Sequence, residues 1–79
     1  MTSRESLMLA MLGRAIEERG ANAEVYAADP NDVRACKALM KRGIVTMRDS
    51  GGRIGRLKEY YYRLNPSFKQ HLASRIADR

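Results

Sequence analysis

The sequence predicts a single α+β domain in which helices pack against a β-hairpin. Residues 3–19 and 30–42 carry apolar side chains at helical spacing, between residues that start and stop helices. Residues 44–64 contain two β-branched or aromatic runs separated by turn-forming residues. A chain of 79 residues has room for one small core, so one domain spanning residues 1–79 is expected.

The first predicted helix spans residues 3–19. Thr2 and Glu5 have the spacing of a capping box, and Gly20 stands where a glycine commonly ends a helix. Leu7 and Leu9 widen its apolar surface, so we expect the helix to be covered by its own domain on one side and by a partner subunit on another. We interpret its methionines as core residues, not as an adaptable binding surface. The main apolar face is formed by Met8, Met11, Leu12, Ala15 and Ile16.

Residues 22–28 are predicted to form a short second helix with Asn22 as its cap. Val25 is its main apolar anchor. A strand is the alternative, but the consecutive alanines Ala27 and Ala28 argue mildly against it.

The third predicted helix spans residues 30–42. Asp29 followed by Pro30 is a strong start signal, and Gly43 is placed to end the helix. A basic stripe lies apart from the apolar face, and on most helices such a stripe is simply solvated. The stripe is formed by Arg34, Lys37 and Lys41; the expected inward face is formed by Val33, Cys36, Leu39 and Met40.

The predicted hairpin covers residues 44–64, with a long glycine- and arginine-rich tip at 49–57. In the second strand, Tyr60, Tyr62 and Leu64 should share one face, and Tyr61 the other. The glycines of the tip fit neither a phosphate-binding loop nor a dinucleotide fingerprint, because those motifs lie between a strand and a helix.

A closing helix is predicted over residues 66–77. Asn65 and Pro66 repeat the combination of a cap residue and a proline. His71 lies beside the apolar stripe and is interpreted as a boundary residue, not as a ligand or base. The stripe is formed by Phe68, Leu72 and Ile76.

Positive charge is concentrated between Val33 and Arg63. This window holds nine basic and two acidic residues, a formal charge of +7, whereas the remainder of the chain carries −1. A polyanion is therefore the first partner to consider. The basic residues are Arg34, Lys37, Lys41, Arg42, Arg48, Arg53, Arg56, Lys58 and Arg63.

Several other classes of protein are disfavoured. Cys36 is the only cysteine, so no intramolecular disulfide can form, and a reducing cytoplasm is expected. Cys36 and His71 cannot supply the four ligands of a typical zinc site, so we expect no metal and no cofactor. No apolar run is long enough to span a membrane, and no signal peptide is expected. One histidine and no nucleophile–base pair argue against an enzyme.

Two motifs stand out in the order of helix, helix, helix, strand, basic tip, strand and helix. The first is Leu39, Gly43, Ile44 and Val45 at the end of the third predicted helix, and the second is residues 61–66, where the last strand leads into the closing helix. Together they resemble the winged helix-turn-helix domain of small bacterial and phage regulators, in which the recognition helix of MarR-like and ArsR-like repressors runs into the wing and the returning wing strand leads into a closing helix. The resemblance implies three helices, a two-stranded β-hairpin wing with a basic tip, and a C-terminal helix. No metal-sensing cysteine pair or ligand-binding extension accompanies it.

The resemblance implies binding to double-stranded DNA by a homodimeric transcriptional regulator. Asn31 and Arg34 would read bases, whereas Lys37, Lys41 and Arg42 would hold phosphates. Duplex RNA is an alternative partner. The alternative function is a protein-interaction module on the same fold, such as a phage protein that modulates a host or viral complex. The full set of expected DNA-binding residues is Asn31, Arg34, Lys37, Lys41, Arg42, Arg48, Arg53, Arg56 and Lys58.

Overall fold

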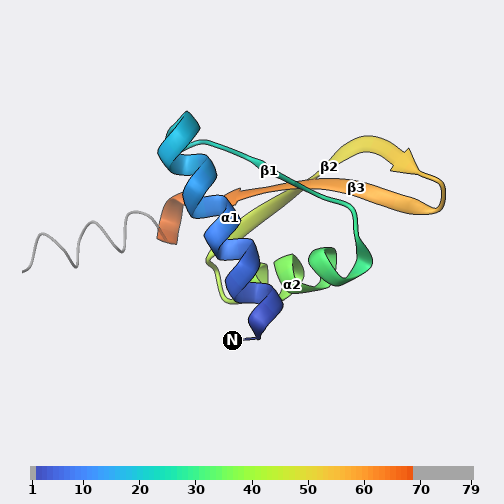
Figure 1. Cartoon of the computed structure of the whole chain (residues 1–79), viewed down its shortest axis with the longest axis horizontal. Helices are drawn as coiled ribbons and strands as arrows, with labels where there is room; N and C mark the ends of the chain where they lie inside the picture. The colour runs from blue at the N-terminus through green and yellow to red at the C-terminus, as the bar shows by residue number, and fades with distance from the viewer. Residues whose placement is uncertain (1, 69–79) are drawn as a thin grey trace, which may run out of the picture.

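A computed structural model describes residues 2–68 as two helices, three strands and, at residues 66–68, a short helical segment (Figure 1). The α+β class expected from the sequence is confirmed. In chain order the elements are α1 (Ser3–Arg19), β1 (Val25–Ala27), α2 (Pro30–Lys41), β2 (Val45–Ile54) and β3 (Leu57–Leu64).

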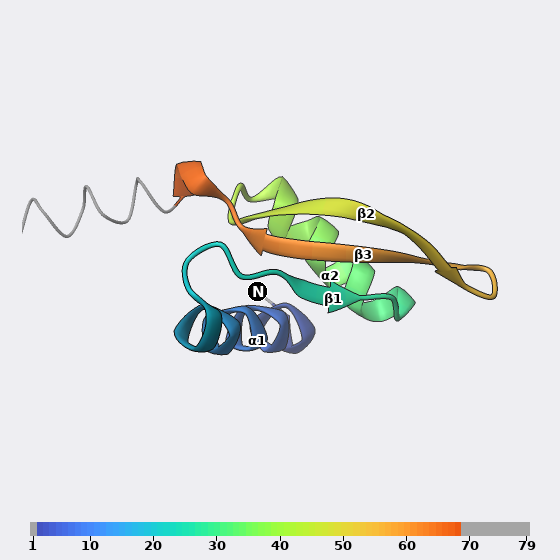
Figure 2. The ribbon, with the colours of Figure 1, turned by 90° about the horizontal axis from the view of Figure 1, so that it is seen from above.

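The strands form one antiparallel sheet in the order β1-β3-β2. Strand β3 is therefore central, and Tyr62 pairs with Val25 on one side and with Met47 on the other. The expected two-stranded hairpin is thus part of a three-stranded sheet. Both α1 and α2 contact the same sheet, and the β2–β3 hairpin projects past them (Figure 2).

The short helix predicted for residues 22–28 is wrong. Residues 21 and 22 form a turn, and residues 25–27 form β1, in which Val25 and Ala27 are buried and Tyr26 is exposed. The alanines weaken a strand only locally, whereas the open edge of β3 offers partners for the backbone of β1. Among residues 2–68, α2 is consequently preceded by a strand and not by a helix.

Helix α1 has the predicted bounds. The Thr2 Oγ1 atom accepts a hydrogen bond from the Glu5 amide at 3.2 Å, and the Gly20 amide donates to the Ile16 carbonyl at 2.8 Å. The return half of the capping box is missing among the described residues, because the Glu5 carboxylate is instead buried between the helices. Met11, expected in the core, is exposed.

Helix α2 begins as predicted and ends one residue earlier, at Lys41. Asp29 Oδ1 accepts a hydrogen bond from the Asn31 amide at 2.8 Å. At the other end the Ile44 amide donates to the Leu39 carbonyl and Gly43, with φ of 75°, donates to Met40, which is the Schellman arrangement. Met40 was expected to face inward but is exposed.

The hairpin tip is shorter than the open 49–57 loop that the sequence suggested. Strand β2 continues to Ile54, and only Gly55 and Arg56 form the turn. The φ of 61° at Gly55, with no positive φ at Arg56, satisfies the requirement of a type II′ turn. The extra residues are absorbed by a bulge, where four steps of β2, from Asp49 to Arg53, accompany two steps of β3.

The core lies between the helices and one face of the sheet. Tyr62 is fully buried, and its hydroxyl donates to the Met8 carbonyl oxygen at 2.9 Å, which joins β3 to α1. The largest buried side chains are those of Tyr62, Met8, Leu12, Leu39, Val45 and Cys36.

The closing helix begins where the sequence predicted. Residues 66–68 are helical, and Asn65 Oδ1 accepts a hydrogen bond from the Ser67 amide at 2.9 Å. The remainder of the predicted helix, with His71, Leu72 and Ile76, lies outside the described residues.

Candidate nucleic-acid interface

The predicted stripe on α2 is an exposed basic face. Asn31, Arg34, Lys37 and Lys41 are all exposed, whereas Ala35, Cys36 and Leu39 point into the core. Arg42, the C-cap residue, is also exposed and extends the positive charge beyond the last turn. The last three turns of the helix and its C-cap therefore present four exposed basic side chains: Arg34, Lys37, Lys41 and Arg42.

These charges are largely free of internal partners. The ion pairs within residues 2–68 are Arg4–Asp32 at 3.0 Å and Arg48–Glu24 at 2.7 Å, and neither includes a basic residue of α2. Lys37 Nζ lies 5.9 Å from the centre of the Tyr60 ring, so the ammonium group extends from the helix toward β3.

Arg48 is not part of this surface. In β2 it alternates with the buried Val45 and with Met47, which packs against the core, so its side chain lies on the opposite face of the sheet from the helices. Two of its guanidinium nitrogens donate to the Glu24 carboxylate at 2.7 and 3.1 Å, and its Cζ atom lies 4.6 Å from the centre of the Tyr61 ring. The hydrogen bonds from Arg48 lower the pKa of Glu24. Arg48 thus has an internal role, and its expected grouping with the α2 residues does not occur.

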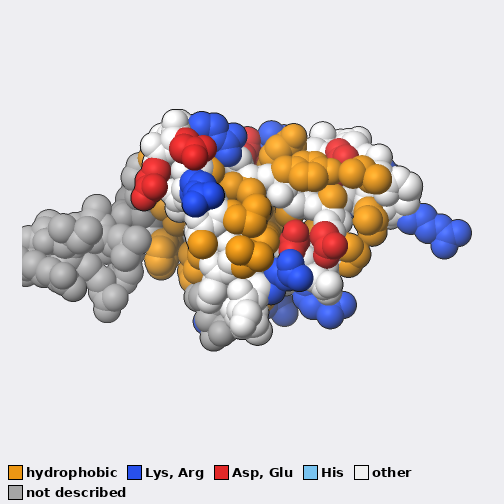
Figure 3. Space-filling view, viewed as in Figure 1, with side chains coloured by type: hydrophobic (Ala, Val, Ile, Leu, Met, Phe, Trp, Pro, Cys, Tyr) orange, Lys and Arg blue, Asp and Glu red, His pale blue; other side chains and the backbone are white. Residues whose placement is uncertain are grey.

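The end of the hairpin forms a second basic region. Arg53 pairs directly with Lys58 in the ladder, and Arg56 occupies the turn; all three are exposed. Like charges placed directly opposite each other in a sheet are destabilising, so nothing in the isolated hairpin favours this pair. Basic side chains mark the free end of the hairpin in the space-filling view (Figure 3).

The two basic regions are separated in space. In both ribbon views the free end of the hairpin lies beyond the N-terminal end of α2 (Figures 1 and 2). The structure therefore groups the predicted residues into two sets. The first is the α2 face of Asn31, Arg34, Lys37, Lys41 and Arg42; the second is the hairpin tip of Arg53, Arg56 and Lys58.

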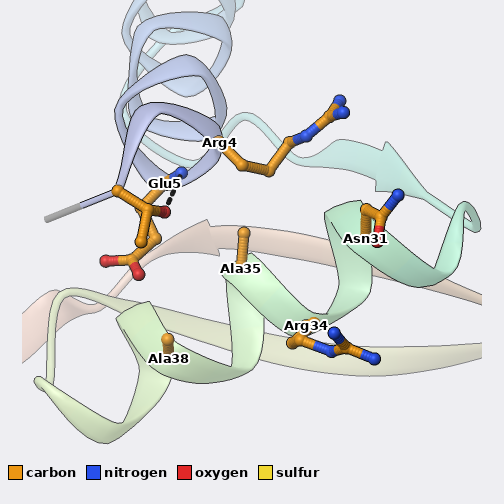
Figure 4. Close-up of a pocket in the computed structure, with 7 residues that line it drawn as sticks. Arg4, Glu5, Asn31, Arg34, Ala35 and Ala38 are labelled. Carbon is orange, nitrogen blue, oxygen red and sulfur yellow. Dashed lines mark hydrogen bonds between the residues drawn. The ribbon is translucent and has the colours of Figure 1, made fainter.

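A pocket that the sequence did not predict lies beside the α2 face. It has a volume of about 260 Å³ and lies between the first turn of α1 and α2, with Asn31 and Arg34 among its lining residues (Figure 4). Glu5 lines the pocket, is only 7% exposed, and has no hydrogen-bond partner for Oε2 within the described residues. The only signal in the sequence was its place in a capping box, which suggested a different role for the carboxylate.

The acids at this end of α2 limit the positive surface. Asp29 caps the helix, and Asp32 binds Arg4, which also lines the pocket. Positive charge on α2 therefore increases from Asn31 toward Lys41 and Arg42.

Within residues 2–68, no helix is long and apolar enough to cross a membrane, and no group of three histidine, cysteine or acidic side chains is arranged to hold a metal ion. Comparison of the chain with protein-family models, curated proteins and solved structures gives no match.

Proposed function

We propose that this chain binds duplex DNA, with α2 in the major groove and the hairpin tip on the adjacent backbone or minor groove. The observation that carries the proposal is the presence of two exposed basic regions on separate projecting elements. A major groove about 12 Å wide accepts an α-helix. Since the tip extends past the end of α2, a helix seated in the groove leaves the tip over neighbouring phosphates.

The residues of α2 divide into two roles. Asn31 and Arg34 are in the first half of the helix, and their amide and guanidinium groups suit bidentate contacts to adenine and guanine. Lys37, Lys41 and Arg42 provide charge for phosphates. In this proposal Arg34 and Asn31 determine sequence preference, and the lysines determine affinity.

The order of elements supports a reduced winged-helix domain. The chain runs from a helix through a strand and a second helix into a hairpin, and β1 pairs with the free edge of β3. The result is one three-stranded sheet packed against two helices. Here β1 follows α1 directly and leads into α2, and a separate helix before the recognition helix is lacking in the described residues. We propose that the chain acts as a small cytoplasmic transcriptional regulator, and no step of this function requires catalysis.

The test is fluorescence anisotropy with labelled duplex DNA of random sequence, at increasing salt. Binding by Z phosphate contacts gives a slope of log K against log[salt] of about −0.9Z. Arg34→Ala/Lys37→Ala and Arg53→Ala/Arg56→Ala/Lys58→Ala should each weaken binding, and the triple variant should reduce the slope by up to about 2.7. Combining Arg34→Ala, Lys37→Ala and Arg53→Ala should abolish most of the affinity.

Arg48→Gln is the matched control, because it removes a positive charge from the opposite face of the sheet. A loss of binding free energy per removed charge that is equal in Arg48→Gln and in the α2 variant, which removes two charges, would show that net charge alone determines binding and would refute the assigned surface. Selection from a random duplex library then reports specificity, and an Arg34→Ala variant should relax it at one position by about 1–3 kcal/mol.

The second candidate is a protein-interaction module, and the open face of the sheet favours it. There Tyr26 and Tyr61 lie 5.8 Å apart in an edge-to-face arrangement, beside the Arg48–Glu24 pair. Tyrosine and arginine are enriched at protein interfaces. No binding to DNA at low salt and micromolar protein would favour this function, whereas stronger binding to duplex RNA than to DNA of the same sequence would identify RNA as the partner.

A further inference from the structure

Helix α1 has an uncovered apolar face. Leu7 is 47% and Met11 is 41% exposed, and together with Ala10 and Arg14 they line a shallow groove of about 220 Å³. Met8, Leu12 and Ala15 on the other side of the helix are buried in the core. Hydrophobic side chains are visible over this region in Figure 3, where α1 faces the viewer. The helix thus has one face for its own domain and a second that no other described element covers.

The outward face continues along the whole helix as a stripe. Arg4, Leu7, Met11, Arg14 and Glu18 recur at intervals of three and four residues, so they lie on one side of α1. All five are exposed. The stripe begins with a positive charge, has its apolar residues in the middle and ends with a negative charge.

We propose that this stripe binds the same stripe of a second copy, with the two α1 helices antiparallel across a two-fold axis near Met11. In that orientation Arg4 of each copy lies opposite Glu18 of the other, and the two Met11 side chains meet at the centre. Leu7 packs along the aliphatic stem of Arg14 of the second copy. A two-fold interface needs such a self-complementary surface.

The charges favour the antiparallel over the parallel arrangement. A parallel pair would place Arg4 against Arg4, Arg14 against Arg14 and Glu18 against Glu18, and like charges at facing positions are unfavourable. The existing bond from Arg4 to Asp32 leaves the Arg4 side chain 48% exposed, so the guanidinium remains available to a second carboxylate.

The interface is small. A helix of 17 residues is about 25 Å long, and one helix pair falls below the roughly 1,200 Å² of a standard interface. The dimer is therefore weak and reversible, with a dissociation constant in the micromolar range. It does not depend on DNA, so it stands or falls separately from the proposed function.

Sedimentation equilibrium of the full chain without DNA tests the inference. We expect a concentration-dependent monomer–dimer equilibrium that Met11→Lys weakens at least about tenfold, because the two charges would meet at the axis. Self-association that is undiminished in Met11→Lys, or a chain that stays monomeric to about 1 mM, would overturn it. A Met11→Lys variant that is monomeric like the wild type but melts at lower temperature would show that the chain covers this face itself, and would also overturn it.

Charge exchange tests the orientation. Glu18→Arg and Arg4→Glu should each weaken the dimer, and the double variant should restore most of it, since the two signs are exchanged across the antiparallel pair and the only other change is loss of the Arg4–Asp32 ion pair. Glu17→Arg is the control, because Glu17 is exposed on the same turn but rotated by about 100° from Glu18. Failure of the double variant to recover, with its helical circular dichroism retained, would contradict the antiparallel arrangement.

Discussion

The buried hydroxyl of Tyr62 provides a direct test of how the core is held together. It donates to the Met8 carbonyl at 2.9 Å and lies 3.7 Å from the Met8 sulfur, across 54 residues of sequence. Tyr62→Phe keeps the ring and removes only this donor. The Met8 carbonyl still accepts the ordinary helical bond inside α1, so no acceptor is left wholly unpaired.

The expected cost is therefore the net value of one buried hydrogen bond, about 0.5–1.5 kcal/mol. For a domain of this size that corresponds to a fall in melting temperature of about 2–12 °C. Urea denaturation followed by circular dichroism measures it. Tyr61→Phe is the control, because it removes the hydroxyl of the neighbouring tyrosine, which makes no hydrogen bond within residues 2–68. It should change the free energy of unfolding by less than about 0.5 kcal/mol. Equal stability of the two variants would refute the proposed role of the bond.

The pH dependence gives a second measurement on the same variant. Burial raises the pKa of the Tyr62 phenol above its ordinary value of 10.0. A raised pKa means that the folded state holds its proton more tightly, so this stability is fully present below pH 10 and is lost as the pH rises toward the folded pKa. The advantage of the wild type over Tyr62→Phe should therefore shrink above pH 10; a constant difference up to pH 11 would contradict the burial argument.

Three further predictions concern local features. Burial raises the pKa of the Cys36 thiol from 9.0 to about 11. At pH 8 the native thiol should therefore react with an aromatic disulfide reagent only as fast as the protein opens, and rapid reaction of the native protein would contradict this. The stability that the protonated thiol contributes is present below pH 9 and should be lost as the pH rises through about 11. In Gly52→Ala the new Cβ would lie 2.5 Å from Glu59 Oε2, so the Glu59 carboxylate should move. That carboxylate now accepts a hydrogen bond from the Tyr26 hydroxyl at 2.8 Å, which raises the pKa of Tyr26, so this pKa should fall in a spectrophotometric titration. An unchanged titration would show that Glu59 does not raise the pKa of Tyr26. Asp29→Ala should cost about 1 kcal/mol in urea denaturation through loss of the α2 cap, and Asp29→Asn, which still caps, should retain most of the stability.

The parts of the fold that the sequence predicted are those with local signals. Both helices carry capping residues at their ends, and the alternation along β3 correctly placed Tyr61 on the other face of the sheet from the buried Tyr62. The α2 stripe followed from the same periodicity, and its basic residues are exposed as expected.

The parts that were missed depend on partners distant in sequence. Strand β1 has only three residues, and it is a strand because β3, some 35 positions later, pairs with it. The bulge in β2 is likewise a property of two strands together. The burial of Glu5 and the hydrogen bonds from Arg48 to Glu24 could not be predicted from any single segment of sequence. Each depends on which helices and strands pack side by side.

The strand order β1-β3-β2 also constrains how the chain folds. Both outer strands need β3, and among the strands of residues 2–68 β3 is the last to be synthesised. A ribosome-bound chain that has not yet exposed residue 64 can form α1 and α2 but has no central strand on which to close the sheet. The β2–β3 hairpin forms locally, whereas joining β1 and the Met8 carbonyl to it closes a loop of more than 30 residues, which slows folding. Closure of the sheet during synthesis therefore waits until residues 57–64 have left the ribosome, and any truncation before Tyr62 removes the residue on which the core is assembled.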